Sequence, residues 1–405
     1  MKPRLPKFAL PSLSLTPEEQ QAVISECETV LAETLAHERS FRRGETTPDK
    51  KEWKQVKARE GIRIRKERHP NHSSPSDVTA PRFLSLHDDS VSSIDSIDSN
   101  EEELDYVTSI KDPRVPMVIT TGTVEGTLED VIFGSMASDE VSWRLRATYM
   151  KDKTSDSKIL ATIIEPTEAD PYKCLCIKWF MREIPGYLSP FMHVRDFLVM
   201  EAAGIRVDEY GERHGYYIMH EFHHPSLPVL QSRKILRCGI SQAYVSRQIG
   251  DKVRMFARGF VDPRGEVPYN ISVQLTTATT ISVTNCVETS YTKKLGWLMM
   301  REEDRRNDPE EPQVVPRSEC SCNKSKAGLT CRVCSASFCS RCVVQKKIVV
   351  DMRDSDVIEH VLPFCFACVL SAKQMSPHEV AVDTVDRPRS FLQSSSASVS
   401  QPSSP

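Results

Sequence analysis

The sequence predicts an α+β protein in which a bent antiparallel sheet is crossed by one long helix and followed by a small cysteine-rich module. Three observations support this fold class. Residues 115–300 hold nearly all of the core-forming material and contain six strand-like segments in succession. They end in a stretch whose apolar side chains recur at helical intervals. Residues 319–371 then hold eight of the 13 cysteines.

Composition and charge exclude some classes of protein. A formal net charge of -3 over 405 residues, with 27% charged and 39% hydrophobic residues, fits neither a nucleic-acid-binding nor a membrane-embedded chain. The first stretch, MKPRLPKFALPSLSL, is basic but lacks the continuous apolar run of a secretory signal. No stretch reaches the roughly 18 to 20 apolar residues that a membrane span requires. We therefore expect a cytoplasmic protein that binds no nucleic acid.

Residues 15–43 predict a single amphipathic helix. Thr16 is suited to cap it, Pro17 to occupy its first turn, and two glutamates follow directly. Apolar side chains then recur at helical spacing as far as Phe41. Such a helix must pack on another part of the protein to be stable. Residues 1–14, which precede it, are expected to be flexible.

Three segments are too polar to offset the entropy of ordering the chain. Residues 44–114 are first basic, as in KKEWKQVKAREGIRIRKERH, and then rich in serine and aspartate, and we expect a disordered linker there. The basic run suits anionic lipid, and the serines of SIDSIDSNEEE suit an acid-directed kinase. Residues 301–318 predict a charged linker, and residues 372–405 a disordered, serine-rich tail.

The strand-like segments of residues 115–300 are mostly bounded by glycine, proline or aspartate. One of them, KCLCIKWFM, shows a regular alternation. Its residues Leu175, Ile177, Trp179 and Met181 alternate with a second set of side chains, the period of a strand with one buried face.

The end of this region is ambiguous from propensity alone. Threonine, valine and isoleucine are frequent in VPYNISVQLTTATTISVTNCVETSYTKKLGWLMM, and these residues favour strands. Apolar side chains from Ile271 to Leu298 nevertheless recur every three or four residues. We predict one long helix, with Lys293 and Lys294 near its C-terminal end, where the helix dipole favours cations.

Eight cysteines form four closely spaced pairs. The pairs are Cys320 and Cys322, Cys331 and Cys334, Cys339 and Cys342, and Cys365 and Cys368. Structural zinc is held by four thiolates, so eight ligands predict two zinc ions. A disulfide framework is the alternative, but it is uncommon in the reducing cytoplasm. Redox catalysis by a C-x-x-C pair would need a thioredoxin-like βαβ context, which the sequence lacks.

The stretch CRVCSASFCSRC, followed by KKIVVDM and VLPFCFAC, resembles a FYVE-type zinc finger, in which alternate pairs of cysteines share an ion. The resemblance implies one zinc on Cys320, Cys322, Cys339 and Cys342, and the other on Cys331, Cys334, Cys365 and Cys368. Arg332, after Cys331, matches an arginine of the family, and by their charge Lys324, Lys326 and Arg332 are candidate contacts of a phosphoinositide headgroup. The sequence departs from the family because KAGLT replaces the basic, histidine-containing stretch before the third cysteine, and the first pair is C-x-C. A structural or protein-binding finger therefore remains an alternative.

The segment from about residue 117 to residue 300 resembles a START-type lipid-transfer domain, which has the helix-grip fold. The resemblance rests on RDFLVMEAAG, on GFVDPRGEVPYNISVQL and on the order of the strands and the final helix. Together the two modules resemble the START-plus-FYVE architecture of oomycete proteins. A START-like domain implies an apolar cavity for a lipid. The candidate lining residues are Trp179, Arg195, Phe197, Tyr217, Met219 and Phe256. Arg195 is a candidate partner of the lipid headgroup, or alternatively of Asp196 in a structural ion pair.

These features predict a non-enzymatic protein. No G-x-S-x-G elbow, P-loop or H-E-x-x-H motif is present. We expect a START-like domain that binds, transfers or senses a lipid, with a finger that recruits the protein to anionic phosphoinositides on endosomal membranes or to a protein partner. The competing hypothesis is an interaction adaptor whose START-like fold serves as a scaffold without a physiological lipid.

Overall fold

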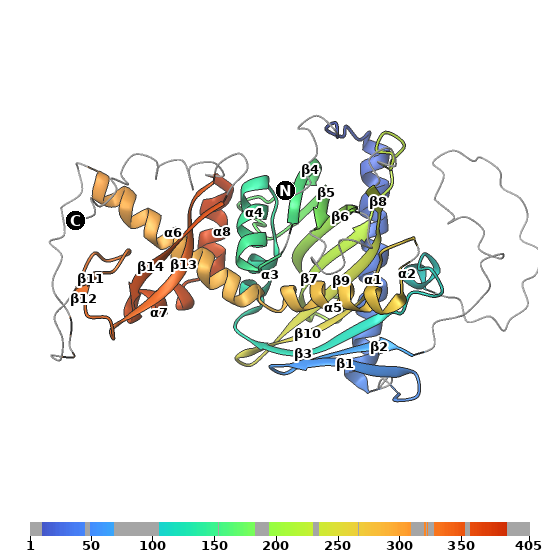
Figure 1. The fold of residues 1–405 in the computed structure, drawn as a ribbon, viewed down its shortest axis with the longest axis horizontal. Coiled ribbons are helices and arrows are strands. Elements are labelled where there is room, and N and C mark those ends of the chain that lie inside the picture. Colours follow the sequence, from blue (N-terminus) through green and yellow to red (C-terminus); the bar gives the residue numbers. More distant parts are fainter. Residues whose placement is uncertain are drawn as a thin grey trace, which may run out of the picture.

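The structure, a computed structural model, describes residues 10–44, 49–68, 105–152, 154–182, 194–229, 235–265, 267–308, 320, 322, 328–352 and 357–386. It consists of a large curved sheet flanked by helices and a C-terminal module that a long helix joins to the sheet (Figure 1). The predicted α+β class is confirmed.

The large sheet has ten strands. They are β1 (Trp53–Arg59), β2 (Ile62–Glu67), β3 (Val118–Glu125), β4 (Thr154–Ile164), β5 (Cys174–Arg182), β6 (Val194–Val207), β7 (Arg213–Glu221), β8 (Ile235–Arg237), β9 (Gly239–Ile249) and β10 (Lys252–Asp262). Their order is β1-β2-β3-β10-β9-β7-β6-β5-β4, all antiparallel, and the short β8 pairs in parallel with the start of β6.

Helices flank the sheet, and a smaller module follows it. The flanking helices are α1 (Pro17–Arg43), α2 (Tyr106–Ser109), α3 (Leu128–Ser135), α4 (Glu140–Tyr149), α5 (Tyr269–Val283) and α6 (Cys286–Asn307). The C-terminal module contains β11 (Leu329–Thr330), β12 (Ser337–Phe338), β13 (Val343–Met352), β14 (Val357–Cys365), α7 (Phe366–Gln374) and α8 (Pro377–Asp386). Among the described helices, none is long and apolar enough to cross a membrane.

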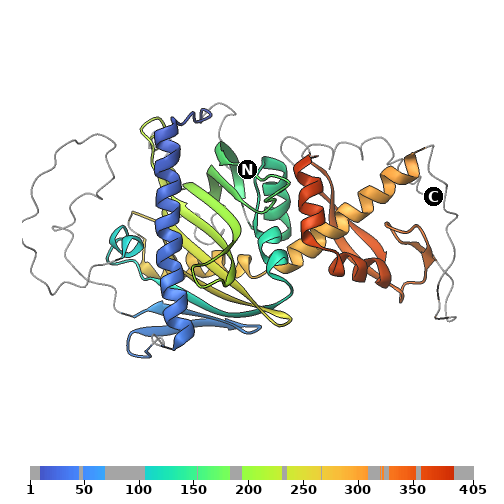
Figure 2. The ribbon, with the colours of Figure 1, turned by 180° about the vertical axis from the view of Figure 1, so that it is seen from behind.

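Helices cover both faces of the sheet. Helix α1 lies across one face (Figure 2), which we call the α1 face, and buries Val30 and Leu31 against it. Helices α3 to α6 cover the opposite face, which we call the inner face (Figure 1). Strand β5 is buried on both sides. The expectation of one buried face is wrong because the second face belongs to an apolar cluster with Leu10, Leu13 and residues of α1.

Helix α1 forms as predicted. The Thr16 hydroxyl accepts a hydrogen bond from the Glu19 backbone N–H, and the Glu19 carboxylate accepts one from the Thr16 backbone N–H. Pro17 occupies the first turn, and Gly44 ends the helix in the left-handed conformation with φ of 77°. These contacts satisfy backbone groups that a helix end leaves unpaired.

The region predicted to be a disordered linker contains ordered structure. Strands β1 and β2 form a hairpin that pairs with β3, where Ile64 lies opposite Thr120. Ile62 and Ile64 alternate with arginines, and both isoleucines are buried against Val118. A stretch of low overall hydrophobicity can thus form ordered strands, because the neighbouring strand β3 buries its few apolar side chains. Residues 69–104 of this linker lie outside the described residues.

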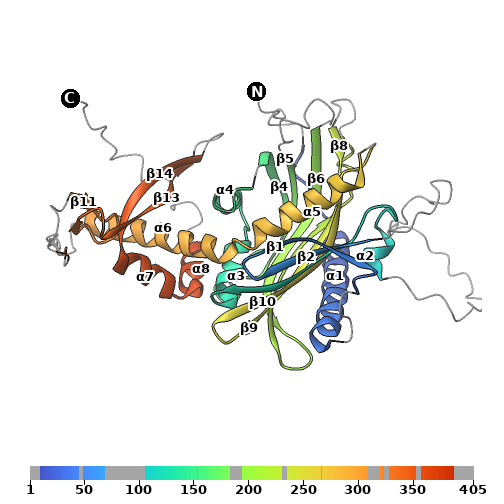
Figure 3. The ribbon, with the colours of Figure 1, turned by 60° about the horizontal axis from the view of Figure 1, so that its bottom comes forward.

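The predicted long helix is two helices in succession, α5 and α6, separated at Thr284 and Asn285 (Figure 3). Helix α6 continues to Asn307, into the predicted charged linker. Lys293 and Lys294 consequently lie in the middle of α6, where both are buried, and not at a helix end. Helix α8 lies within the segment predicted to be a disordered tail. It is ordered because its apolar residues Val380 and Ala381 are buried in the core of the sheet domain.

Candidate metal centres and the interior of the sheet domain

The structure brings the eight predicted cysteines together as two groups of four. Cys320, Cys322, Cys339 and Cys342 form the first group; Cys331, Cys334, Cys365 and Cys368 form the second. Within each group all sulfur atoms lie within 4.8 Å of one another. This alternation of pairs is the one that the FYVE resemblance implies.

Sulfur–sulfur distances fit tetrahedral coordination of a metal ion. A metal–sulfur distance of about 2.3 Å gives a regular tetrahedron with edges of about 3.8 Å. In the first group, the Sγ atom of Cys322 lies 3.2 Å from that of Cys320 and 3.4 Å from that of Cys339. In the second, the Sγ atoms of Cys334 and Cys365 are 3.9 Å apart. Each group can therefore hold one metal ion.

Tight turns place these thiols. The backbone N–H of Cys331 donates to the carbonyl oxygen of Ala336 over 3.0 Å, and Ser335 adopts a left-handed φ of 58° between them. The backbone N–H groups of Cys365 and Cys368 donate to the sulfurs of Cys331 and Cys365, over 3.3 and 3.4 Å. Such N–H···S contacts orient thiolate ligands and offset their negative charge.

Of the three predicted headgroup contacts, only one is described. Arg332 lies beside the second cysteine group with its side chain exposed, and its backbone N–H donates to the carbonyl oxygen of Pro363 over 3.1 Å. Lys324 and Lys326 lie outside the described residues.

The six predicted cavity residues do not share one surface. Phe197, Tyr217 and Met219 belong to the inner face. Trp179 packs on the α1 face, and the ring of Phe256 lies 5.7 Å from that of Phe41 in α1. The prediction of a common wall is therefore wrong for Trp179 and Phe256, because neighbouring residues of a strand point to opposite faces.

Arg195 is buried at the rim of the sheet. Its Nε atom donates to the carbonyl oxygen of Pro263 over 2.9 Å. Asp196, on the other face of β6, pairs with Arg237 over 2.9 Å and accepts from the indole of Trp179 over 2.7 Å.

A buried ionic cluster on the inner face was not anticipated. Glu201 binds both guanidinium nitrogens of Arg146, over 2.7 and 2.9 Å, and the ammonium of Lys178 over 2.7 Å. The Tyr217 hydroxyl donates to the same carboxylate over 3.1 Å. Burial works to raise the pKa of Glu201, but the charges of Arg146 and Lys178 outweigh it and hold that pKa at about 2. In the sequence, Lys178 and Glu201 each stand within an otherwise apolar strand. Charges buried in this way must pair, so their positions could have predicted the cluster.

The buried side of α5 is rich in hydroxyl groups. Five are buried there, on Ser272, Thr276, Thr277, Thr279 and Thr280. Most hydrogen-bond within the protein; for example, the Thr276 hydroxyl accepts from the backbone N–H of Val261 over 2.9 Å. The Thr277 hydroxyl is buried without a hydrogen-bond partner among the described residues.

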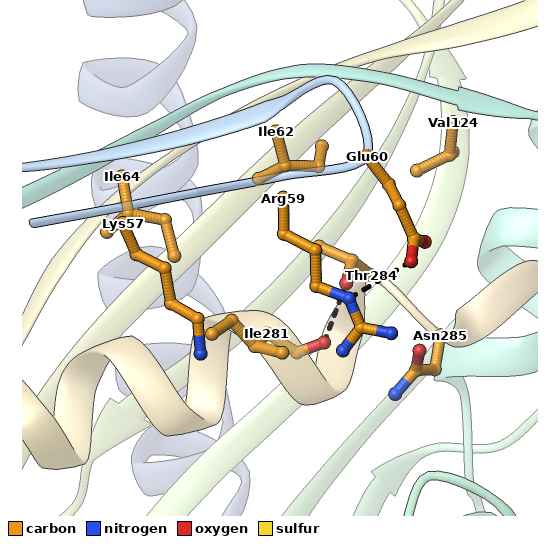
Figure 4. Close-up of a pocket in the computed structure, with 9 residues that line it drawn as sticks. All are labelled: Lys57, Arg59, Glu60, Ile62, Ile64, Val124, Ile281, Thr284 and Asn285. Atoms are coloured by element: carbon orange, nitrogen blue, oxygen red, sulfur yellow. Dashed lines mark hydrogen bonds and ion pairs between the residues drawn. The ribbon is translucent and has the colours of Figure 1, made fainter.

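Two hollows lie next to the helices of the sheet domain. A cleft of about 50 Å³ lies between the β1–β2 hairpin and the joint of α5 and α6 (Figure 4). There Arg59 pairs with Glu60 over 3.1 Å, above Thr284 and Asn285. The cleft has room for about one or two water molecules. A larger cavity, of about 260 Å³, lies among α3, α4, α6 and α8.

Comparison with known proteins adds the following. No protein-family model matches the sequence, and no curated protein matches it. Among solved structures, human StAR-related lipid transfer protein 5 is similar, with 15% identity and a TM-score of 0.41 over 67% of this chain and 97% of that one. Human STARD10 has 10% identity and a TM-score of 0.36 over 68% of this chain and 89% of that one. The lipid transfer and protein localization domain of human StarD13 has 11% identity and a TM-score of 0.35, over 63% and 95% respectively.

Proposed function

We propose that this chain is a non-enzymatic lipid-binding protein, which binds, transfers or senses a lipid between α5 and the inner face of its sheet. The observation that carries the proposal is the Thr277 hydroxyl, which is buried on α5 without a partner among the described residues. An unpaired buried hydroxyl costs roughly 1 to 3 kcal/mol. A polar group of a lipid would satisfy it, while the acyl chain packs on apolar residues of the inner face such as Phe197 and Met219.

The test is native mass spectrometry of the full chain, followed by denaturing extraction of bound lipid. We expect a lipid-sized adduct that Thr277→Val weakens, because valine keeps the shape of threonine but removes its hydroxyl. Thr292→Val is the matched control. Thr292 lies in α6, and its hydroxyl already donates to the Glu288 carbonyl oxygen of that helix. Folded protein that carries no adduct and takes up no fluorescent lipid from vesicles would contradict the proposal.

We propose zinc as the metal of both cysteine groups. Four thiolates in a tetrahedron are the usual donor set of structural zinc. Its role in this chain is to fold the C-terminal module. Two zinc ions per chain in the same native spectrum are the expected result, whereas disulfide-paired cysteines would contradict it.

We further propose that the C-terminal module recruits the protein to anionic phosphoinositides on endosomal membranes. The exposed Arg332 beside the second cysteine group supports this proposal. Arg332→Glu is expected to weaken co-sedimentation with vesicles that contain phosphatidylinositol 3-phosphate. Arg341→Glu removes an exposed arginine beside the first cysteine group and is the control. Equal binding by both variants would count against a role for Arg332.

One observation favours the adaptor function. Val361, Phe366 and Leu370 of the C-terminal module are apolar, and their exposed fractions are 63%, 57% and 53%. Phe366 and Leu370 lie one turn apart on α7 and so share a face. A protein partner retained by the native chain and lost by Phe366→Ser with Leu370→Ser, with the lipid adduct unchanged, would support the adaptor function.

A further inference from the structure

The cavity among α3, α4, α6 and α8 lies outside the lipid site proposed above. Its volume is about 260 Å³, larger than the cavity of about 150 Å³ that holds benzene in an engineered protein. Helices α3, α4 and α8, with Pro166 and Pro171, provide its apolar walls; α6 provides a lysine, and Asp139 and Glu165 add carboxylates to the lining. The residues that matter here are Phe133 and Met136 of α3, Leu145 of α4, Val380 and Ala381 of α8, and Lys293 of α6.

Lys293 is the unusual member of this lining. Its side chain is buried, and only 9% of the residue is exposed. Its Nζ atom donates to the carbonyl oxygens of Phe133 and Met136, over 2.8 and 3.2 Å. An ammonium group has three donors, so one remains for another acceptor. Among the described residues, no carboxylate lies within ion-pair distance of Lys293.

The next residue shows how this chain otherwise treats a buried lysine. The Nζ atom of Lys294 lies 2.8 Å from a carboxylate oxygen of Asp130. It also donates to the carbonyl oxygens of Lys373 and Met375, at the end of α7. Lys294 is thus paired with a carboxylate, whereas the ammonium of Lys293 meets only the two carbonyl oxygens, the ring of Phe133 at 5.0 Å and the cavity.

The environment of Lys293 opposes its charge. Burial and then the nearby charge of Arg146 lower the pKa of Lys293 to about 7. Asp139, which also lines the cavity, acts in the opposite direction. The Asp139 carboxylate accepts hydrogen bonds from the backbone N–H groups of Val141 and Ser142, because it caps α4. An anion at Lys293 would compensate a buried charge that the protein leaves without a counter-ion.

We propose that this cavity binds a small amphipathic carboxylic acid, with the carboxylate on Lys293 and the apolar body between α3, α4 and α8. The walls are predominantly apolar, and Lys293 is the one cation of the lining; of the two carboxylates, Asp139 caps α4 and Glu165 is exposed to solvent. Such a site orients a ligand by its head group. Because α8 follows the cysteine module in the chain, the bound acid would also hold the end of that module against the sheet domain.

The test is isothermal titration calorimetry of the full-length, zinc-loaded chain with sodium octanoate and with octan-1-ol. Octanoate is expected to bind more tightly than octanol to the native chain. Lys293→Met should weaken octanoate about tenfold or more and leave octanol unchanged, since it removes only the charge-assisted bond. Ala381→Phe should abolish binding of both probes, because the ring fills the cavity.

Lys373→Met is the matched control, because Lys373 is an exposed lysine near α8 that does not line the cavity. Hydrogen exchange of α8 gives a second readout, which octanoate should slow in the native chain and not in Ala381→Phe. Equal affinity for octanoate and octanol, or an unchanged octanoate affinity in Lys293→Met, would overturn the proposal, as would no octanoate binding to the native chain. If Lys293→Met does not fold, the proposal is still tested by the difference in affinity between octanoate and octanol and by the loss of binding in Ala381→Phe. The lipid adduct of the inner face should persist in Ala381→Phe. A failure of the carboxylic-acid site at Lys293 can therefore be distinguished from a failure of the lipid site at α5.

Discussion

The sheet domain and the C-terminal module are stabilised in different ways. Both faces of the sheet are covered by helices, and many large apolar side chains, such as Phe260 and Met200, are fully buried between them. The C-terminal module has a small apolar cluster that includes Phe364 and Ile348, part of which α6 contributes. Its strands β11 and β12 have two residues each. A small unit of this kind needs metal or covalent links to fold, whereas a large one does not.

Removal of the proposed zinc ions should produce the largest difference in stability between the two regions. Chelation under reducing conditions is expected to abolish protection from hydrogen exchange in β13 and β14 and to leave β5 to β7 protected. Apparent binding energies of structural zinc are roughly 10 to 16 kcal/mol, and in small metal-binding domains this energy drives folding. Cys331→Ser should lose one of the two ions, and Cys238→Ala, outside both groups, should keep both. Protection that survives chelation would show that the module folds without metal.

Loss of Glu201 should be the largest single-residue effect within the sheet domain. Glu201→Gln leaves Arg146 and Lys178 buried without their counter-ion, which costs about 3 to 5 kcal/mol. We expect a fall in Tm on the order of 10 °C for the sheet domain. Glu168→Gln, at an exposed position, is the control. A fall of similar size in the control would assign the effect to net charge.

The same carboxylate should make the sheet domain sensitive to acid. The pKa of Glu201 is lowered from 4.5 to about 2 in the folded protein. Its contribution to stability is therefore complete above about pH 4.5 and is lost as the pH falls towards 2, by roughly 3 kcal/mol. Thermal unfolding followed by tryptophan fluorescence measures this, because Trp143 and Trp179 are buried in the sheet domain. Glu201→Gln should flatten the dependence in this window.

The smallest effect concerns the start of α1. Thr16→Ala removes the capping hydroxyl and should cost about 1 kcal/mol, with faster hydrogen exchange confined to the first turn. Thr29→Ala is the matched control, since Thr29 lies in the interior of the same helix and its hydroxyl bonds to the Ser25 carbonyl oxygen. An equal loss in both variants would assign the effect to helix propensity and not to the cap.

Local patterns made parts of this structure predictable. The Thr16 cap and the grouping of the cysteines depend on residues close in sequence or on recognisable spacing. The assignment of Trp179 and Phe256 to the cavity was wrong because sequence alternation shows that two faces exist but not which helix covers each. The hairpin of β1 and β2 was missed because Ile62 and Ile64 are buried only by contacts made with β3 and α5, distant in sequence.

The succession of α5 and α6 has a mechanical consequence. Helix α5 lies against β10 and β3, while α6 contributes Leu295 and Met299 to the apolar cluster of the cysteine module. The 22 residues of α6 span about 33 Å. The first half of α6 packs on α3 in the core of the sheet domain, and its middle also contacts the cysteine module. Because one continuous helix contacts both regions, the direction of α6 sets where the cysteine module lies relative to the sheet.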